Sequence, residues 1–190
     1  MRYVLYLVMM CVVALGVGFG LSWVALSEGR LFGATQVGPW VAWTDVGASA
    51  PNPYTRAHIA RAAALPLGQS EGLQFTATTD SAGAPLTRAC TYRIAGRTPV
   101  ASFWTLAAVD ADGVNIAAPD ADAALRSNRL ARSADGAIPV TVGTTLMPLN
   151  WVEITGEGPF HLVLTLYDMP AFAGVSSSAD MPTITAERCR

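Results

Sequence analysis

Apolar and polar residues alternate in several short segments of the second half of the chain. The clearest case is 160–167, where one set of alternate positions is Phe160, Leu162, Leu164 and Leu166, and the other is His161, Val163, Thr165 and Tyr167. Shorter alternations occupy 73–78, 90–95 and 138–142. A period of two predicts strands with one face packed on a core, so Leu164 should be buried while His161 and Thr165 are more exposed.

The segment Val100–Gly113 differs because it is apolar at nearly every position. Such a run predicts a central strand that is covered on both faces. It ends in Asp110-Ala-Asp-Gly113, which is a turn signal, and Asp80–Gly83 and Asp135-Gly136 are further turn signals.

One helix is expected early in the soluble part. Asn52 is a good N-cap, Pro53 suits the first helical position, and Pro66 with Gly68 ends a helix over 53–65. Short strands separated by turns, with one early helix, predict a mainly β fold: an antiparallel β-sandwich or jelly-roll-like domain. The expected division is an anchor over 1–27, a Gly-rich connector over 28–51 and the β domain over 52–190.

The N-terminal segment Tyr3–Leu26 contains no charged residue over its 24 positions. As a helix it would be roughly 36 Å long, enough to cross a hydrocarbon core of about 30 Å. The alternative is a cleaved secretory signal, whose apolar region is shorter and ends in a small-x-small site. Ala25 and Ser27 form a poor site of that kind beside bulky Trp23. We therefore predict a single-span transmembrane anchor.

The flanking charges give a weak orientation. Arg2 and the amino terminus favour a cytoplasmic N-terminus, whereas Arg30 opposes it. A short leader before a first apolar segment is typical of an exported body, and Trp23 lies where an interfacial aromatic would anchor the outer end. The expected location is the inner (cytoplasmic) membrane, with the C-terminal domain in the periplasm.

The charge pattern bears on partners. The net charge is −2, and all 12 basic residues are Arg, without a cluster of the kind that grips phosphates. Nucleic acid is therefore not an expected partner. An all-Arg, Ala-rich chain is typical of a GC-rich bacterial genome.

The three cysteines fall in two settings. Cys11 lies within the predicted span, whereas Cys90 and Cys189 lie in the body. An exported body is in an oxidising compartment, and the tail residues Thr183–Thr185 can form a final strand beside 90–95. We predict a Cys90–Cys189 disulfide; the alternative is two unpaired thiols.

No motif of a known chemistry is present. The sequence lacks a nucleophile elbow, a phosphate-binding loop, a zinc-protease helix and a dinucleotide fingerprint, and a catalytic triad would need His58 or His161. Asp110, Asp112 and nearby Asn115 have oxygen ligands suited to Ca²⁺, but such residues are also typical of turns, and we favour the turn. No metal or cofactor is expected.

A few side chains are candidates for a ligand pocket between the sheets. Large aromatic residues and adjacent polar groups are typical of such pockets, although aromatic residues more often pack in a core. The candidates are Trp104, Asp110, Asn150, Trp151 and Tyr167.

The order of these segments resembles a known family, domain of unknown function 1214. The matching segments, over roughly 72–185, are Phe103–Leu106 with Asp110–Gly113, Ala134–Gly136 before 138–142, Asn150-Trp151, Gly158–Phe160 and Leu164–Tyr167. The resemblance implies a β-sandwich that often forms the C-terminal part of a larger protein beside a second uncharacterised domain. Here Val152–Thr155 replaces the Pro-containing apolar stretch common in the family.

Two functions remain open. The first is a membrane-anchored, periplasm-facing binding or accessory module of the cell envelope, with a second envelope protein as its partner. The alternative is an enzyme or enzyme subunit, hydrolase-like, with a site in the sandwich loops.

Overall fold

The computed structural model describes residues 2–27, 33–63, 67–68, 70–132, 139–169 and 181–190. Two helices and ten strands follow in chain order: α1 Arg2–Ser27, β1 Thr35–Val37, β2 Trp40–Ala42, α2 Pro53–Ala62, β3 Gly72–Ala77, β4 Cys90–Ala95, β5 Phe103–Val109, β6 Leu125–Arg126, β7 Val140–Gly143, β8 Asn150–Glu153, β9 His161–Tyr167 and β10 Thr183–Cys189. A 3₁₀ turn, η2, spans Ser127–Arg129. Asp135-Gly136 and Ile138 lie outside the described residues.

The strands form two sheets. The larger has six strands in the order β1-β2-β3-β9-β5-β6, and the smaller has four in the order β10-β4-β7-β8. Pairing is antiparallel except between β7 and β8, which run parallel with Val140 opposite Asn150. The smaller sheet is therefore mixed, which corrects the expectation of an antiparallel domain throughout.

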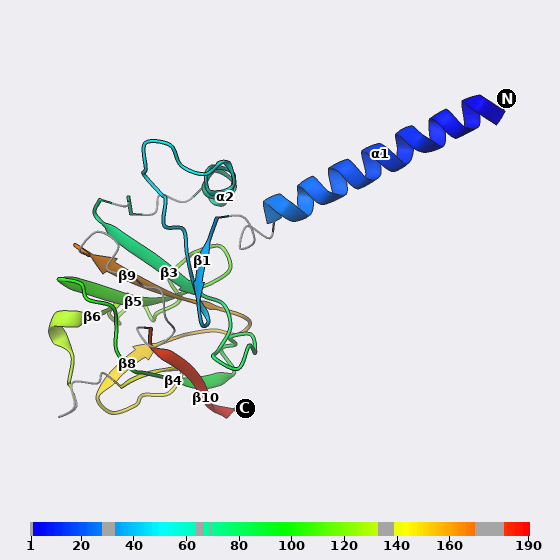
Figure 1. Ribbon diagram of the computed structural model, residues 1–190. Coiled ribbons are helices and arrows are strands. Elements are labelled where there is room, and N and C mark those ends of the chain that lie inside the picture. Colours follow the sequence, from blue (N-terminus) through cyan, green and yellow to red (C-terminus); the bar gives the residue numbers. More distant parts are fainter. Residues whose placement is uncertain (1, 28–32, 64–66, 69, 133–138, 170–180) are drawn as a thin grey trace.

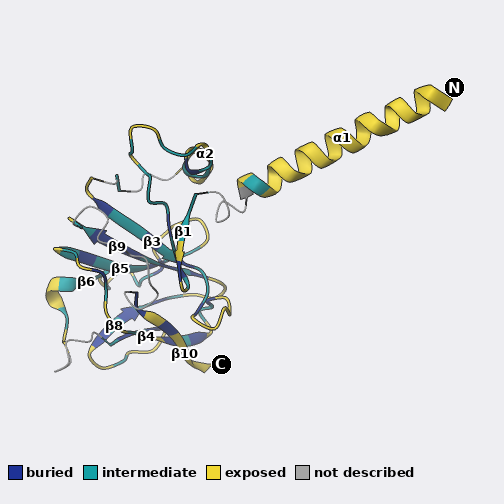
Figure 2. Cartoon of the chain, in the orientation of Figure 1, coloured by how far each residue is buried: buried dark blue, intermediate teal, exposed yellow. Residues whose placement is uncertain are grey.

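The two sheets share one core. The buried side chains include Phe75 and Leu164 of the larger sheet and Tyr92 and Val142 of the smaller. Figure 2 shows the buried positions along the inner strands of both sheets. The ring of Tyr92 meets Phe160, just before β9, edge to face at 5.7 Å. Burial of such large apolar surfaces is the main favourable term in folding.

The alternation in β9 is confirmed on its apolar face. Leu162, Leu164 and Leu166 are at most 1% exposed. On the other face His161 is half-buried, and Thr165 is more exposed than the leucines, as predicted, although at 8% it is still a buried residue. Thr165 lies between strands on both sides, which shield it from water.

The expected central strand is shorter and less central than the sequence indicates. β5 is buried only at alternate positions, as Trp104 and Leu106 are, while Phe103 and Thr105 are half-buried. β5 lies next to the two-residue strand β6 near the sheet edge, and β9 pairs with both β3 and β5. The strand with buried leucines, β9, therefore occupies the central position that the sequence predicted for β5.

The predicted connector contributes to the larger sheet. β1 and β2 form a hairpin that adds to β3, with Trp40 opposite Ala77. Trp40 is fully buried, and its indole Nε1 donates to the carbonyl oxygen of Pro182 at 2.7 Å. This bond joins the N-terminal hairpin to the start of β10.

α2 begins as predicted. The Asn52 side chain accepts a hydrogen bond from the Tyr54 backbone N–H at 2.9 Å, with Pro53 in the first turn. Asp45 accepts from the Asn52 N–H at 2.6 Å and from the Thr55 hydroxyl at 2.7 Å. Thr55 is fully buried, so this side of α2 is fixed to the body.

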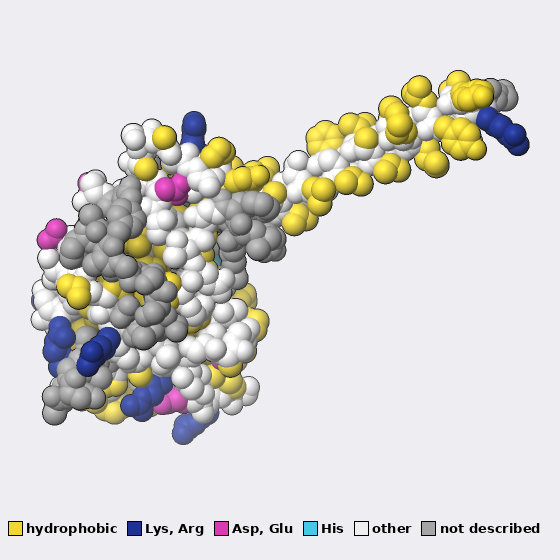
Figure 3. All heavy atoms as spheres, in the orientation of Figure 1, with side chains coloured by type: hydrophobic (Ala, Val, Ile, Leu, Met, Phe, Trp, Pro, Cys, Tyr) yellow, Lys and Arg dark blue, Asp and Glu magenta, His cyan; other side chains and the backbone are white. Residues whose placement is uncertain are grey.

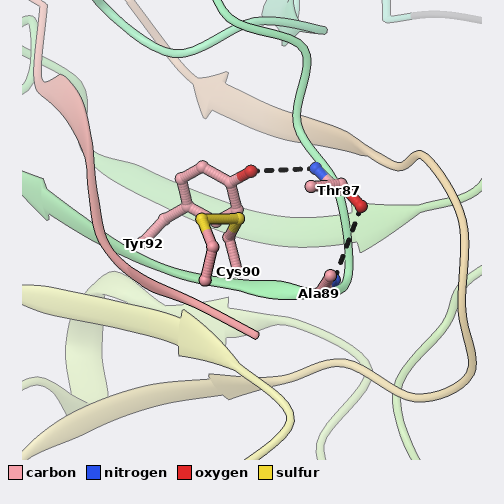
Figure 4. Close-up of a disulfide and its surroundings, with 5 residues drawn as sticks. Thr87, Ala89, Cys90 and Tyr92 are labelled. Carbon is pink, nitrogen blue, oxygen red and sulfur yellow. Dashed lines mark hydrogen bonds between the residues drawn. A yellow bond between two sulfur atoms is a disulfide. The ribbon is translucent and has the colours of Figure 1, made fainter.

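The predicted disulfide is present. Cys90 and Cys189 are joined, with a Cα–Cα distance of 4.0 Å, and they are register partners in β4 and β10. Figure 4 shows the bond beside Tyr92, whose hydroxyl accepts a hydrogen bond from the Thr87 N–H. The C-terminal strand is therefore covalently held against β4.

α1 differs from every other element because all its described side chains except Ala25 are exposed. It projects from the rest of the chain, and its C-terminal end lies beside α2 (Figure 1). It is long and apolar enough to cross a membrane, with a mean hydropathy of 2.5.

Candidate functional site

The predicted pocket residues Trp104 and Tyr167 lie on opposite faces of the larger sheet. Across β5 and β9, Tyr167 is the register partner of Phe103, and Trp104 is the partner of Leu166. Because successive side chains of a strand alternate between faces, the indole of Trp104 enters the core while the phenol of Tyr167 lies on the outer face. A single pocket between the sheets therefore does not hold both side chains.

Asp110 builds a turn. Its Oδ1 accepts hydrogen bonds from the backbone N–H groups of Asp112 at 3.0 Å and Val114 at 2.9 Å. Asn115 is used in a similar way, because its Oδ1 accepts from the Ala117 N–H. These oxygens satisfy the local backbone, as the turn interpretation predicts. Within the described ranges, no group of three His, Cys, Asp or Glu side chains is placed to hold a metal ion.

Asn150 is a buried structural link. Its Nδ2 donates to the carbonyl oxygens of Ala131 at 2.7 Å and Pro139 at 3.0 Å, and its Oδ1 accepts from the Ala131 N–H at 2.9 Å. The amide thus joins the start of β8 to the chain before β7. The neighbouring Trp151 is half-buried, and its indole Nε1 donates to the Gly143 carbonyl oxygen at 3.2 Å.

The outer face of the larger sheet carries a polar row across four strands. Gln74 of β3 pairs with Thr165 of β9, Thr165 pairs with Thr105 of β5, and Thr105 pairs with Arg126 of β6. Register partners project from the same face, so amide, hydroxyl, hydroxyl and guanidinium groups follow one another across the sheet. Gln74 and Thr105 are half-buried, and Arg126 is exposed. We call these four residues the polar row.

An aromatic pair borders the polar row on one side. Phe103 and Tyr167 lie two residues further along β5 and β9, and so on the same face, with ring centroids 5.6 Å apart. On the other side lie the smaller side chains of Val163 and Ala107, which are also register partners. The row is therefore a strip of hydrogen-bonding groups between an aromatic border and an aliphatic one.

The chemistry of the polar row suits binding. Hydroxyl and amide groups can both donate and accept hydrogen bonds, and the Arg126 guanidinium donates in a fixed planar fork. Aromatic borders with a few placed polar groups are typical of sites that orient a ligand. The row contains no carboxylate, imidazole or thiol, so it lacks the groups that general acid–base or thiol chemistry requires.

Among the residues of the polar row and its borders, the sequence indicated only Tyr167 as a candidate site residue. The alternation in 73–78 and 160–167 places Gln74 and Thr165 on the polar face of their strands. It does not reveal that they are neighbours, because that depends on the pairing of β3 with β9. Arg126 gave no signal, since its strand is two residues long.

The comparisons with known proteins agree with this architecture. A family model described as "Protein of unknown function (DUF1214)" matches residues 71–171. No curated protein matches the chain. The crystal structure of the VPA0106 protein from Vibrio parahaemolyticus is similar, with a TM-score of 0.58 and 18% identity over 74% of this chain and 36% of that one.

A second solved structure, a putative uncharacterized protein from Burkholderia cenocepacia, has a TM-score of 0.48 and 15% identity over 66% of this chain and 32% of its own. The chain thus spans about a third of the length of the solved structures it matches. The likeness to the Vibrio protein shows a shared fold.

Proposed function

This chain belongs to the DUF1214 family of proteins of unknown function, and we propose that it is a membrane-anchored binding or accessory module of the cell envelope. In this proposal α1 spans the inner membrane once, and the β domain faces the periplasm. The two sheets, which share one core, form a β-sandwich.

The observation that supports this function most directly is the exposure of α1. Large apolar side chains along the helix are exposed, from 89% for Tyr3 to 38% for Leu26. An exposed apolar surface of this extent is unfavourable in water, whereas a hydrocarbon core buries it. This exposure supports a bilayer as the environment of the helix.

The disulfide favours the periplasmic side. Structural disulfides persist in oxidising compartments such as the periplasm and are rare in the cytosol. Cys90 is only 8% exposed and is joined to the C-terminal strand, so the bond is part of the packed domain. A domain closed in this way fits an exported location.

The polar row favours binding over catalysis. Half-buried Gln74 and Thr105 and exposed Arg126 offer hydrogen-bonding and cationic groups to a polar ligand or to a protein surface, whereas Thr165 between them is buried. The Phe103–Tyr167 aromatic pair lies beside them. The chain spans only 36% of the Vibrio protein. In this proposal the partner that the polar row binds is a second envelope protein.

The test has two parts. Bacteria expressing the full chain are fractionated and washed with carbonate at high pH, and spheroplasts are then treated with protease. We expect the protein to stay in the membrane pellet with its N-terminus intact, and the β domain to be digested from outside. A mature N-terminus near Ser27 by mass spectrometry, or a domain protected until the cells are lysed, would overturn the proposal.

The binding role is tested by affinity isolation of the intact protein from membranes. A partner protein or a small molecule that co-purifies and is lost when the polar row is changed would support the module. Turnover of a substrate by the isolated domain would instead support the enzyme alternative.

A further inference from the structure

The end of α1 touches α2 through one specific pair. The guanidinium carbon of Arg61 lies 5.1 Å from the ring centroid of Trp23. A cation this close to an indole face is attracted by the ring quadrupole. The contact joins a residue of the apolar helix to a residue of the β domain's helix, and Figure 1 shows the C-terminal end of α1 near α2.

The position of Trp23 sets the depth of this pair in a membrane. Trp23 precedes Leu26, the last residue of the apolar stretch, by less than one helical turn, about 5 Å along the axis. Tryptophan at that place lies at the level of the lipid headgroups. A charged group is costly in the hydrocarbon core, so Arg61 also lies in the headgroup layer.

α2 is suited to this layer. Its residues Pro53–Ala62 include exposed Arg56 and Arg61 and contain no acidic side chain. Thr55 attaches the opposite side of the helix to the body through Asp45. Figure 3 shows hydrophobic side chains where α1 meets the rest of the chain.

His58 adds a packed aromatic contact without adding a charge. Its ring stacks on Trp43, with centroids 4.4 Å apart and an interplanar angle of 22°. Burial, with a smaller contribution from the charge of Arg61, lowers the pKa of His58 below its ordinary value. The imidazole is therefore neutral near pH 7, and the positive charge of this helix comes from its two arginines.

We propose that α2 is a membrane-contact helix in which Arg61 binds the phosphate of an anionic phospholipid headgroup beside the end of α1. The guanidinium is held on Trp23 at the level of the phosphates, and planar guanidinium groups bind phosphate through paired hydrogen bonds. Arg56 adds a second positive charge to the same helix. The contact holds the β domain close to the bilayer instead of leaving it on a free tether. This inference rests on the proposed membrane anchoring.

The test is hydrogen exchange of α2 in the full chain, reconstituted in nanodiscs of phosphatidylcholine with or without phosphatidylglycerol. We expect the backbone amides of residues 54–62 to exchange severalfold more slowly in the anionic discs. Inorganic phosphate added to the neutral discs should leave the exchange unchanged. Equal protection in both lipids, or equal protection by free phosphate, would overturn the inference.

Variants assign the effect to Arg61. Arg61→Gln should abolish the increase caused by anionic lipid, Arg61→Lys should restore part of it, and Arg188→Gln, the same charge change on exposed β10, should retain all of it. An increase that survives in Arg61→Gln would assign lipid binding to another residue and contradict the proposal. Each variant is first checked for the Cys90–Cys189 disulfide on a non-reducing gel.

The two proposals fail separately. If the protein leaves the membrane in a carbonate wash, the anchoring proposal fails. If it stays inserted but α2 shows no response to anionic lipid, only the lipid contact fails.

Discussion

Cys90 and Cys189 are register partners at the ends of β4 and β10, and their sulfurs are bonded although 99 positions separate them in the chain. β10 is an edge strand, and apart from Ile184 its residues are exposed. Few buried contacts hold its end, so the covalent bond fixes the C-terminus to the sheet.

Removing this bond should destabilise the domain. In the chain-entropy model, closing a loop of about a hundred residues contributes up to roughly 4.7 kcal/mol, and measured losses are typically about 2–5 kcal/mol. We expect the Cys90→Ser, Cys189→Ser double variant to unfold at a clearly lower urea concentration. Cys11→Ser in α1 is the matched control and should behave as wild type. Equal midpoints for wild type and double variant would show that strand pairing alone holds β10.

Gly72 has no room for a side chain. A Cβ at this position would clash with the carbonyl oxygen of Leu166, a backbone atom of the adjacent strand β9. Gly72→Ala must therefore move β3 away from β9, and overpacking of this kind costs about 1–3 kcal/mol or more. Gly68→Ala is the control, since a Cβ at Gly68 meets no atom within 4 Å. The thermal midpoint of each variant measures the difference, and a stable Gly72→Ala would mean that the strands separate easily.

Leu164 tests the assignment of the core face. It is 1% exposed in β9, between Phe75 and Leu106 on the neighbouring strands. Leu164→Asp would bury an unpaired carboxylate, which costs several kcal/mol or forces the group to become neutral, so the variant should not fold. Thr185→Asp on the exposed side of β10 should fold normally. A soluble Leu164→Asp protein with its disulfide formed would contradict the observed packing.

The sequence predicted individual strands and helices better than it predicted which strands lie next to each other. The strands in 73–77, 90–95 and 160–167 and the Asn52 cap follow from local alternation and capping, and the structure contains all of them. The disulfide was predicted because the body contains two cysteines and was expected to lie in an oxidising compartment. These features depend on residues close in the chain, or on a choice between only two thiols.

The missed features depend on long-range pairing. β1 and β2 are three residues each within a Gly-rich segment, so they become recognisable as strands only when β3 is beside them. The parallel pairing of β7 with β8 contradicts the usual expectation for strands joined by a short connection. The polar row was hidden for the same reason, because its four members come from four strands.

Substitutions in the polar row should weaken the binding of a partner without preventing the domain from folding. Thr105→Val and Thr165→Val keep the β-branched shape and remove only a hydroxyl, so the fold should be retained. Any partner that co-purifies with the intact protein should be retained less well by these variants and by Arg126→Gln. Thr185→Val on β10 is the matched control. Co-purification that is unchanged in all three row variants would place the binding surface elsewhere.

His58 predicts a pH dependence of stability with a definite sign. Its pKa in the folded protein is lowered from 6.5, chiefly by burial and further by the charge of Arg61. The unfolded chain therefore takes up the proton at a higher pH than the folded chain does. As the pH falls through 6.5 towards the folded pKa, the stability contributed by neutral His58 should be lost progressively. The urea midpoint measured across this range should fall with pH in wild type and fall less in His58→Gln. The same loss in both proteins would assign the dependence to other groups. A midpoint that rises as the pH falls would contradict a half-buried, neutral histidine stacked on Trp43.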